Sequence, residues 1–359
     1  AGRGGSRRVA AGRGGVMQPA LHEEAPGRGD AVPSDPVAGR SRWLRRLAPW
    51  VASAVVIALL LWRYSPRAIA AELARGSVVG QLPWIAAIAV GALVMMAGAD
   101  WLVFSAALAA GRRLRALDVA RGRAATSAVL SVHYGLTAGG YALWLARRTG
   151  VGAAAAVGAA TYQMLSDLAA VCLFALPAAL VGARLLPGRV GASAALLAGA
   201  GVAGISLLLL LGPRVAPRRW RGGRVLAAWV RVPPPVWAAS LLLRAGTLAL
   251  NIAGTWGAAR AFGLTIPFEA LAAGLPIAYL VGALPVNVLG LGAVQAAWLA
   301  LFAAHAPGAQ ILAFQFSFQL LSALALLVRG LPFLPGVLRD LEDGAPEESR
   351  APSPAAPGA

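Results

Sequence analysis

Eight long apolar segments most restrict how this chain can fold. A window of about 18 or more nearly uncharged residues can cross a bilayer core of about 30 Å as a helix. The segments are rich in Ala, Leu, Val and Gly without apolar-polar alternation, which favours helices over a barrel. They lie at residues 47–62, 82–110, 119–146, 151–182, 190–211, 236–262, 266–306 and 308–334. The sequence therefore predicts an all-α, polytopic membrane helical bundle.

Composition divides the chain into three expected parts. Residues 1–42 are rich in Gly, Arg and Pro and are predicted to form a disordered basic tail. Residues 43–338 form the expected integral membrane domain, and the acidic residues 339–359 a disordered C-terminal tail. Met17 is a candidate start. No secretory signal peptide stands before the first apolar segment, which we interpret as an uncleaved membrane helix.

The formal net charge of +18 comes from arginines that lie between and around the apolar segments. This distribution is typical of topology determinants and not of a nucleic-acid-binding face. Five arginines lie in residues 111–123, six in 212–235 and nine in 1–46. We expect these regions to face the cytoplasm, which predicts a multi-pass protein of the inner (cytoplasmic) membrane with both termini inside.

Three apolar segments lie between two loops that are both expected in the cytoplasm. Three full crossings would place these loops on opposite sides, so one segment must enter and leave the membrane by the same face. The segment 119–146 is the candidate, because HYGLTAGGY lies at its middle. Its glycines can supply a break in the helix, and irregular backbone at membrane depth is tolerated where protein or water covers it. The predicted break residues are Gly135, Gly139 and Gly140. We expect a re-entrant hairpin that enters from the cytoplasmic side.

A second break lies in the apolar segment 266–306, where the chain reads LPVNVLGLGAVQ at 284–295. Pro285, Gly290 and Gly292 are the predicted turn of a hairpin that enters from the outside. The chain then has about six full crossings and two re-entrant segments; eight spans is the alternative.

An internal repeat supports the pairing of the two hairpins. TYQMLSDLA at 161–169 is similar to SFQLLSALA at 317–325, so that Gln163 matches Gln319. Each copy follows a glycine-containing segment. Inverted repeats of broken and crossing helices are typical of transporters with a substrate site near the bilayer midplane.

Ionisable and amide side chains within the apolar segments are candidate substrate-binding residues, because burying a charge in the bilayer is costly. Asp167 either pairs with an arginine such as Arg244 or accepts a proton or a cationic headgroup. Asp100 is expected to lie at the interface because it is near a helix end. The other candidates are Gln163, Asn287, Gln295, Gln319, His133, Arg147 and Arg148.

Metal and cofactor chemistry is not expected. The chain has one cysteine, Cys172, and three histidines that lie far apart in the sequence. It contains no phosphate-binding loop of the GxxxxGK type, and GLG at 290–292 follows no strand. We therefore expect no metal, no cofactor and no ATP-driven transport by this chain alone.

Two stretches resemble one bacterial family. AFGL, an apolar helix, LPVNVLGLGAVQAAWLALF and a closing helix are similar to the lysylphosphatidylglycerol synthetase transmembrane region, also called flippase-like membrane proteins. TAGGYALWLARRTG followed by TYQMLSDL resembles the first conserved block of that family. The resemblance covers about residues 45–335. It implies a flippase-type helical fold that moves aminoacylated phospholipids or polyprenyl- or sterol-like lipids.

The chain departs from the family pattern at three points. Gln295 stands where the family usually has glutamate, Gln319 lies where an arginine is common, and the first block lacks its proline. The changed set of charges leaves the identity of the lipid open.

The preferred prediction is a non-enzymatic translocator of a lipid or a lipid-linked substrate. Its expected partners are membrane lipids and a lipid-modifying enzyme, with no nucleic acid; the oligomeric state stays open. One alternative is a membrane-embedded transferase with a polyprenyl or phospholipid donor, although no loop carries the paired acids such chemistry needs. Another is a scaffold that binds a soluble partner through its basic loops.

Overall fold

The structure is a computed structural model that describes residues 51, 53–108, 114–130, 134–182, 190–215, 224–282 and 292–343. All regular structure in these ranges is helical, as the sequence predicts. The predicted tail 1–42, the last residues of the chain, His133, Pro285, Asn287 and Gly290 lie outside the described residues.

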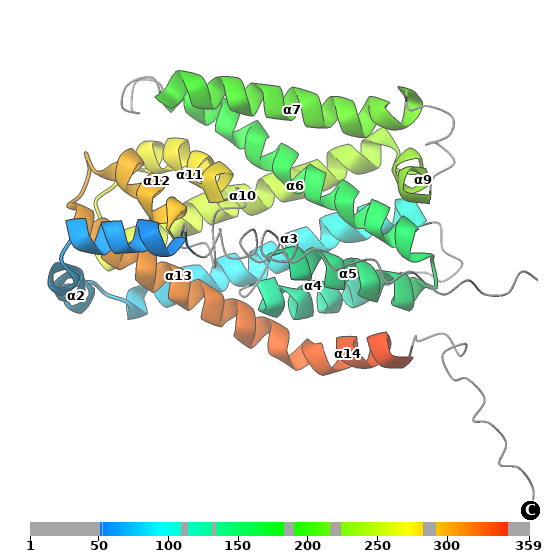
Figure 1. Ribbon diagram of the computed structural model, residues 1–359, viewed down its shortest axis with the longest axis horizontal. Helices are drawn as coiled ribbons and strands as arrows, with labels where there is room; N and C mark the ends of the chain where they lie inside the picture. The colour runs from blue at the N-terminus through cyan, green and yellow to red at the C-terminus, as the bar shows by residue number, and fades with distance from the viewer. Residues whose placement is uncertain are drawn as a thin grey trace, which may run out of the picture. The chain divides into compact units, whose positions relative to one another are not determined.

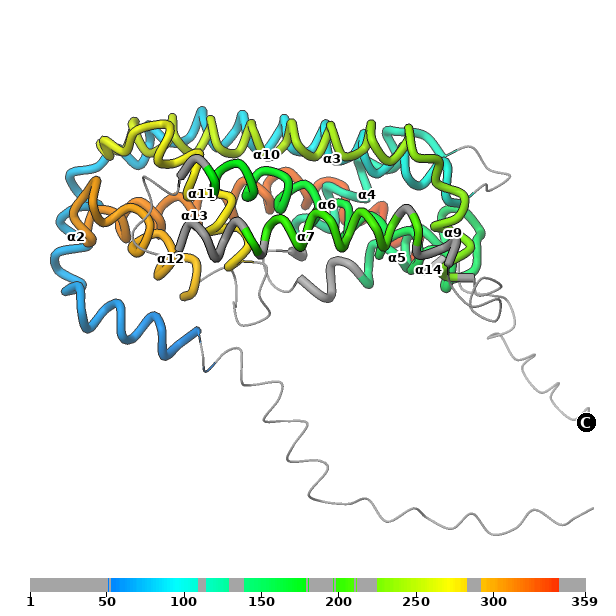
Figure 2. The backbone as a smooth tube through the Cα atoms, turned by 90° about the horizontal axis from the view of Figure 1, so that it is seen from above, coloured from blue at the N-terminus to red at the C-terminus, as the bar shows by residue number. Residues whose placement is uncertain are grey.

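Within the described ranges, four helices are long and apolar enough to cross a membrane. They correspond to the helices α3 (Leu82–Leu108), α6 (Ala153–Gly182), α10 (Pro234–Phe262) and α13 (Gly308–Gly330). α3 and α10 lie side by side along one edge of the bundle (Figure 2), and α7 (Val190–Val215) packs along α6. The multi-pass membrane architecture is therefore confirmed, whereas six crossings stay a prediction.

Large apolar side chains on these helices point away from the protein. Examples are Val90, Leu242 and Leu320, which are 62%, 74% and 70% exposed. A soluble protein rarely exposes so much apolar surface, because contact of this surface with water is unfavourable. The exposed faces therefore fit contact with lipid acyl chains.

The first described helix, Ser53–Arg63, is followed by α2 (Pro66–Arg75) at an angle of 80°. Ser65 stands before Pro66 and has an extended conformation (φ −47°, ψ 132°). The ring of a proline disfavours helical backbone in the preceding residue, which explains the bend. The two helices could form a fifth, broken span.

Two pairs of short helices pack as hairpins. The first pair is α4 (Ala116–Leu130) and α5 (Tyr134–Thr149); the second is α11 (Phe268–Gly282) and α12 (Ala293–Phe302). Figure 1 shows α4 and α5 at the end of the bundle that holds α9 (Arg224–Val230), and α11 and α12 at the end near α2. Opposite entry of two hairpins requires this arrangement, although the re-entrant topology itself stays a prediction.

The predicted break in the first hairpin differs from the structure. Gly135, Gly139 and Gly140 are helical residues of α5, and α4 ends at Leu130, before all three. Glycine permits a break but does not cause one, and Leu136 and Ala138 between these glycines favour a continuous helix. In the second hairpin, Gly292 has a φ of 98° and immediately precedes α12. This left-handed conformation favours glycine.

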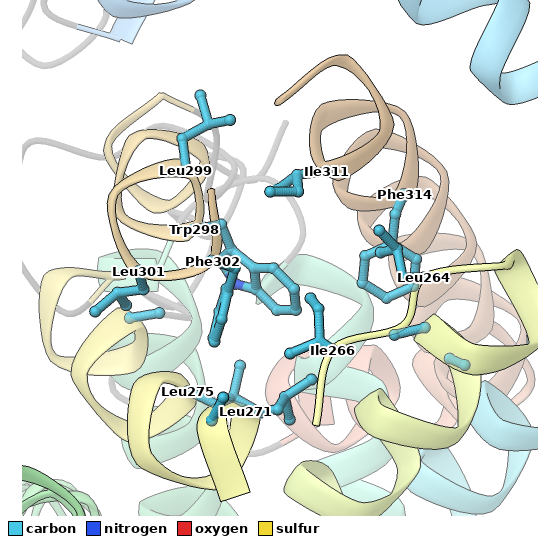
Figure 3. Packing of buried hydrophobic residues seen from close by; sticks show 14 of the residues in the cluster. Leu264, Ile266, Leu271, Leu275, Trp298, Leu299, Leu301, Phe302, Ile311 and Phe314 are labelled. Atoms are coloured by element: carbon cyan, nitrogen blue, oxygen red, sulfur yellow. The ribbon is translucent and has the colours of Figure 1, made fainter. Parts of the chain in front are cut away.

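Aromatic and aliphatic side chains fix the second hairpin against α13 (Figure 3). Trp298 and Phe302 of α12 are buried, with ring centroids 4.8 Å apart, and Trp298 also contacts Phe314 of α13. Leu264 and Ile266, from the segment between α10 and α11, point into the same cluster. This core holds one end of the bundle together.

Residues 339–343, which the sequence assigns to a disordered tail, are helical. A helix, α14 (Leu334–Asp343), continues past residue 339. Asp340 accepts a hydrogen bond from Trp144 Nε1 (3.0 Å) and lies 3.9 Å from Arg148. These contacts with α5 order the first acidic residues, which composition alone assigns to the tail.

Candidate functional site

A network of buried charges connects α3, α4, α6 and α10. Arg244 on α10 is 2% exposed, and its Nη2 donates to Asp100 Oδ1 at 2.8 Å. Its Nη1 pairs with Asp167 Oδ1 on α6. Arg123 on α4 donates to Asp100 Oδ2 at 3.1 Å. Two arginines are therefore bound to two aspartates from different helices, as buried charges require.

Asp100, Asp167 and Arg244 lie within candidate membrane spans. Asp167 is 14 residues after Ala153 and 11 before Ala178, the ends of its span. At 1.5 Å per residue this places it about 21 Å and about 17 Å from the two ends. Arg244 lies ten residues inside its own span, about 15 Å from the nearer end. The network is therefore at membrane depth, where a charge normally indicates a functional site.

A cavity of about 370 Å³ lies beside the network. Both hairpins line it, through Tyr141 of α5 and Tyr279 of α11, and the long helices α3, α6, α10 and α13 complete its wall. Its charged and amide lining residues are Arg123, Gln163, Asp167, Asn251, Gln319 and Arg329. The remaining wall is mostly aliphatic. Such a mixed lining suits a polar group attached to an apolar chain.

The charges at the cavity do not balance. Arg123, Arg244 and Arg329 carry three positive charges, against two negative charges on Asp100 and Asp167. The guanidinium of Arg329 donates through Nη1 to the carbonyl oxygen of Ala89, a neutral acceptor. The described residues of the site therefore leave one excess positive charge beside the cavity.

The structure brings four of the predicted site residues together. Gln163, Asp167 and Gln319 line the cavity, and Arg244 lies behind its wall. Gln163 Nε2 donates to Asp167 Oδ2 at 2.8 Å. The pairing of Asp167 with Arg244, one of two readings of the sequence, is confirmed. Gln163 and Gln319, the two matched residues of the predicted repeat, thus line one cavity.

Arg147 and Arg148 lie elsewhere, at the C-terminal end of α5, and do not line the cavity. Arg148 is half exposed and donates to Asp118 of α4 at 3.2 Å. It also lies 3.9 Å from Asp340 of α14. Its observed contacts therefore connect helix ends. His133 and Asn287 lie outside the described residues.

Gln295 is fully buried in the first turn of α12 and does not line the cavity. Its side-chain oxygen accepts a hydrogen bond from the Gly292 backbone N–H. This bond satisfies one of the amides that every helix leaves unpaired at its N-terminus. The observed contact is therefore a helix cap rather than a substrate contact.

Three further charged residues belong to the site. The sequence predicts an interfacial position for Asp100, and this prediction is wrong, because Asp100 is 0% exposed and accepts bonds from Arg123 and Arg244. Arg123 lies in one of the arginine-rich segments that the sequence assigns to the cytoplasmic side, and Arg329 is not among the predicted site residues. Both line the cavity.

The fold and this cavity define a multi-pass, all-helical membrane protein with a charged site at membrane depth. Residues 47–330 match the family described as the lysylphosphatidylglycerol synthase TM region. The chain belongs to this family, which confirms the resemblance found in the sequence. A comparison with curated proteins gives no match.

Proposed function

We propose that this protein moves a lipid or a lipid-linked substrate between the leaflets of the cytoplasmic membrane and does so without chemical change. The observation that carries the proposal is the cavity at membrane depth with its charged lining. A polar headgroup can enter such a cavity while its acyl chains stay in the bilayer. Family membership supports involvement of the chain with lipids.

The alternative, a membrane-embedded transferase, needs a general base or metal-binding carboxylates. Asp167 is the carboxylate among the described lining residues, and its two oxygens bond to Arg244 and Gln163. A carboxylate held in this way is poorly placed to accept a proton from a substrate. This observation favours translocation.

The arginine-rich segments of the sequence support a location in the cytoplasmic membrane with both termini inside, which the proposal includes. The proposal includes a separate lipid-modifying enzyme that supplies the substrate, since the family description refers to the membrane region of a lipid synthase.

The test is a lipid-transfer assay with purified protein in phosphatidylcholine vesicles that contain traces of fluorescent, acyl-labelled lipids. Dithionite added outside bleaches the outer leaflet, so transfer makes the inner label accessible. We expect protein-containing vesicles to lose the protected fraction faster than protein-free vesicles. Equal loss in both, for anionic, zwitterionic and cationic headgroups alike, would contradict the proposal.

A matched pair of variants on α3 connects transfer to the cavity. Ala92 lines the cavity, whereas Ala87 is exposed on the same helix. The indole in Ala92→Trp fills part of the cavity and should abolish most of the transfer. Ala87→Trp adds the same side chain toward lipid and should leave transfer unchanged. Equal effects of the two substitutions would remove the cavity from the transfer route.

A further inference from the structure

The charges of the cavity identify the class of headgroup, provided that the proposed lipid transfer is correct. A cationic headgroup needs a carboxylate that can pair with its ammonium group. An anionic headgroup needs a guanidinium with unused donors. Among the described residues, the site offers such a guanidinium, whereas its carboxylates are already paired with protein groups.

The carboxylates of the site are already bound by protein. Asp100 accepts from Arg244 at 2.8 Å, from Arg123 at 3.1 Å and from Tyr141 at 3.4 Å. It is fully buried and does not itself line the cavity. Asp167 lines the cavity, but both of its oxygens are bonded. An ammonium group would have to displace an arginine to reach Asp100, and at Asp167 it would meet a carboxylate whose charge Arg244 already compensates.

Arg329 offers the opposite chemistry. It lines the cavity from α13, and no carboxylate lies within 4.0 Å of it among the residues that the structure describes. One bond goes to the neutral Ala89 carbonyl, and its buried Nε has no hydrogen-bond partner. A guanidinium carries five N–H donors in a fork that matches phosphate oxygens.

Arg123 adds a second guanidinium to the same lining from α4. Two like charges at one low-dielectric cavity repel each other, so an anion between them lowers the energy of both. Asn251, Gln319 and Thr247 add neutral groups that can bond to hydroxyls. None of these groups would neutralise the positive charge of a cationic ligand.

We infer that the cavity selects lipids whose headgroup carries a phosphate without a compensating ammonium group, and that Arg329 binds this phosphate. The headgroup class therefore differs from the aminoacylated, cationic lipids implied by the family resemblance. Anionic glycerophospholipids, such as phosphatidylglycerol, and polyprenyl phosphates share the required chemistry. The acyl or prenyl chain stays outside the cavity.

The experiment compares three acyl-labelled lipids in the same phosphatidylcholine vesicles: phosphatidylglycerol, phosphatidylcholine and lysylphosphatidylglycerol. We expect phosphatidylglycerol to be transferred fastest, at least about tenfold faster than the lysylated lipid, because the ammonium groups of the lysyl moiety bring positive charge next to Arg123 and Arg329. Equal rates, or faster transfer of the lysylated lipid, would overturn the inference and leave lipid transfer established. No transfer of any lipid would instead contradict the proposed function.

Variants at Arg329 locate the selectivity. Arg329→Gln should slow phosphatidylglycerol transfer about tenfold, and Arg329→Lys should restore part of the rate because it keeps the charge. The matched control is Arg260→Gln, because Arg260 is exposed on α10 and packs over Trp256 outside the cavity. An unchanged rate in Arg329→Gln would contradict the role of this residue.

A second variant keeps the inference testable if Arg329→Gln fails to fold. Ser322 lines the cavity, and Ser322→Asp adds a carboxylate to the lining. It should slow the transfer of phosphatidylglycerol and accelerate that of the lysylated lipid; no shift in the ratio of the two rates would count against selection by charge.

A competition experiment distinguishes the two lipid classes. Unlabelled undecaprenyl phosphate and unlabelled phosphatidylglycerol are each added to the assay, and their inhibition of labelled phosphatidylglycerol transfer is compared. Stronger inhibition by undecaprenyl phosphate would identify a polyprenyl phosphate as the preferred substrate, and the reverse order would identify the glycerophospholipid.

Discussion

At the scale of residues, the two aspartates of the buried network differ in how many partners each holds. Asp100 is fully buried and accepts bonds from two arginines and a tyrosine. The Asp167 side chain is 24% exposed and holds one arginine and one glutamine. Removal of one partner of a buried pair leaves an uncompensated charge, so the two positions should differ in their contribution to stability.

Asp100→Asn should lower the free energy of unfolding by roughly 3–5 kcal/mol, because Arg123 and Arg244 then face a neutral amide. Asp167→Asn should cost about 1–2 kcal/mol, because Arg244 keeps Asp100 and the site stays partly accessible. Melting of the purified variants in one detergent measures this order. A lower melting temperature for Asp167→Asn than for Asp100→Asn would contradict the network as described.

Part of this site could be predicted from the sequence. Asp167 and Arg244 stand out because each is a charge within a long apolar segment, and opposite charges at membrane depth must pair. Arg123 and Arg329 could not be separated from the many arginines that mark cytoplasmic loops. Only the helix packing, which brings α4 and α13 beside α3, shows that their side chains line the cavity.

At the scale of elements, the apolar segments correspond well to the observed helices, whereas the position of a break within a segment does not follow from its glycines. A glycine can serve a turn, a close helix contact or neither. Gly330 at the end of α13 serves a close contact, since a Cβ there would lie under 3.0 Å from Ala124 O of α4. For Gly139 in α5, no heavy atom within the described part of the chain lies within 4 Å of such a Cβ.

Alanine substitution of these two glycines should therefore have opposite effects. Gly330→Ala should destabilise the protein by about 1–3 kcal/mol, because backbone atoms cannot move aside easily. Gly139→Ala should be neutral or stabilise by up to about 1 kcal/mol, because alanine favours a helix. Thermal unfolding compares the two. Marked destabilisation by Gly139→Ala would restore the break predicted from the sequence.

At the scale of the whole membrane domain, the helix lengths bear on topology. α4 and α5 have 15 and 16 residues, and α11 and α12 have 15 and 10. At 1.5 Å per residue each is at most about 24 Å long, shorter than a bilayer core of about 30 Å. Short paired helices fit hairpins that return to the face they entered. α13 links the two ends, since its Gly308 lies against Tyr64 and its Gly330 against α4.

Cysteine labelling tests this topology in a background with Cys172→Ala, a buried position that tolerates a small residue. Single cysteines at Leu117 and Ala153, two exposed positions, flank the first hairpin; Thr265 and Ala304, also exposed, flank the second. If both hairpins are re-entrant from opposite faces, an impermeant maleimide should label cysteines 265 and 304 in intact cells. Cysteines 117 and 153 should react only in inverted membrane vesicles.

The two positions that flank a re-entrant hairpin lie on the same face of the membrane. If the chain instead crossed the membrane once between them, the two positions would lie on opposite faces. Labelling of 117 and 153 from different sides would therefore exclude the first hairpin as re-entrant, and the same result for 265 and 304 would exclude the second.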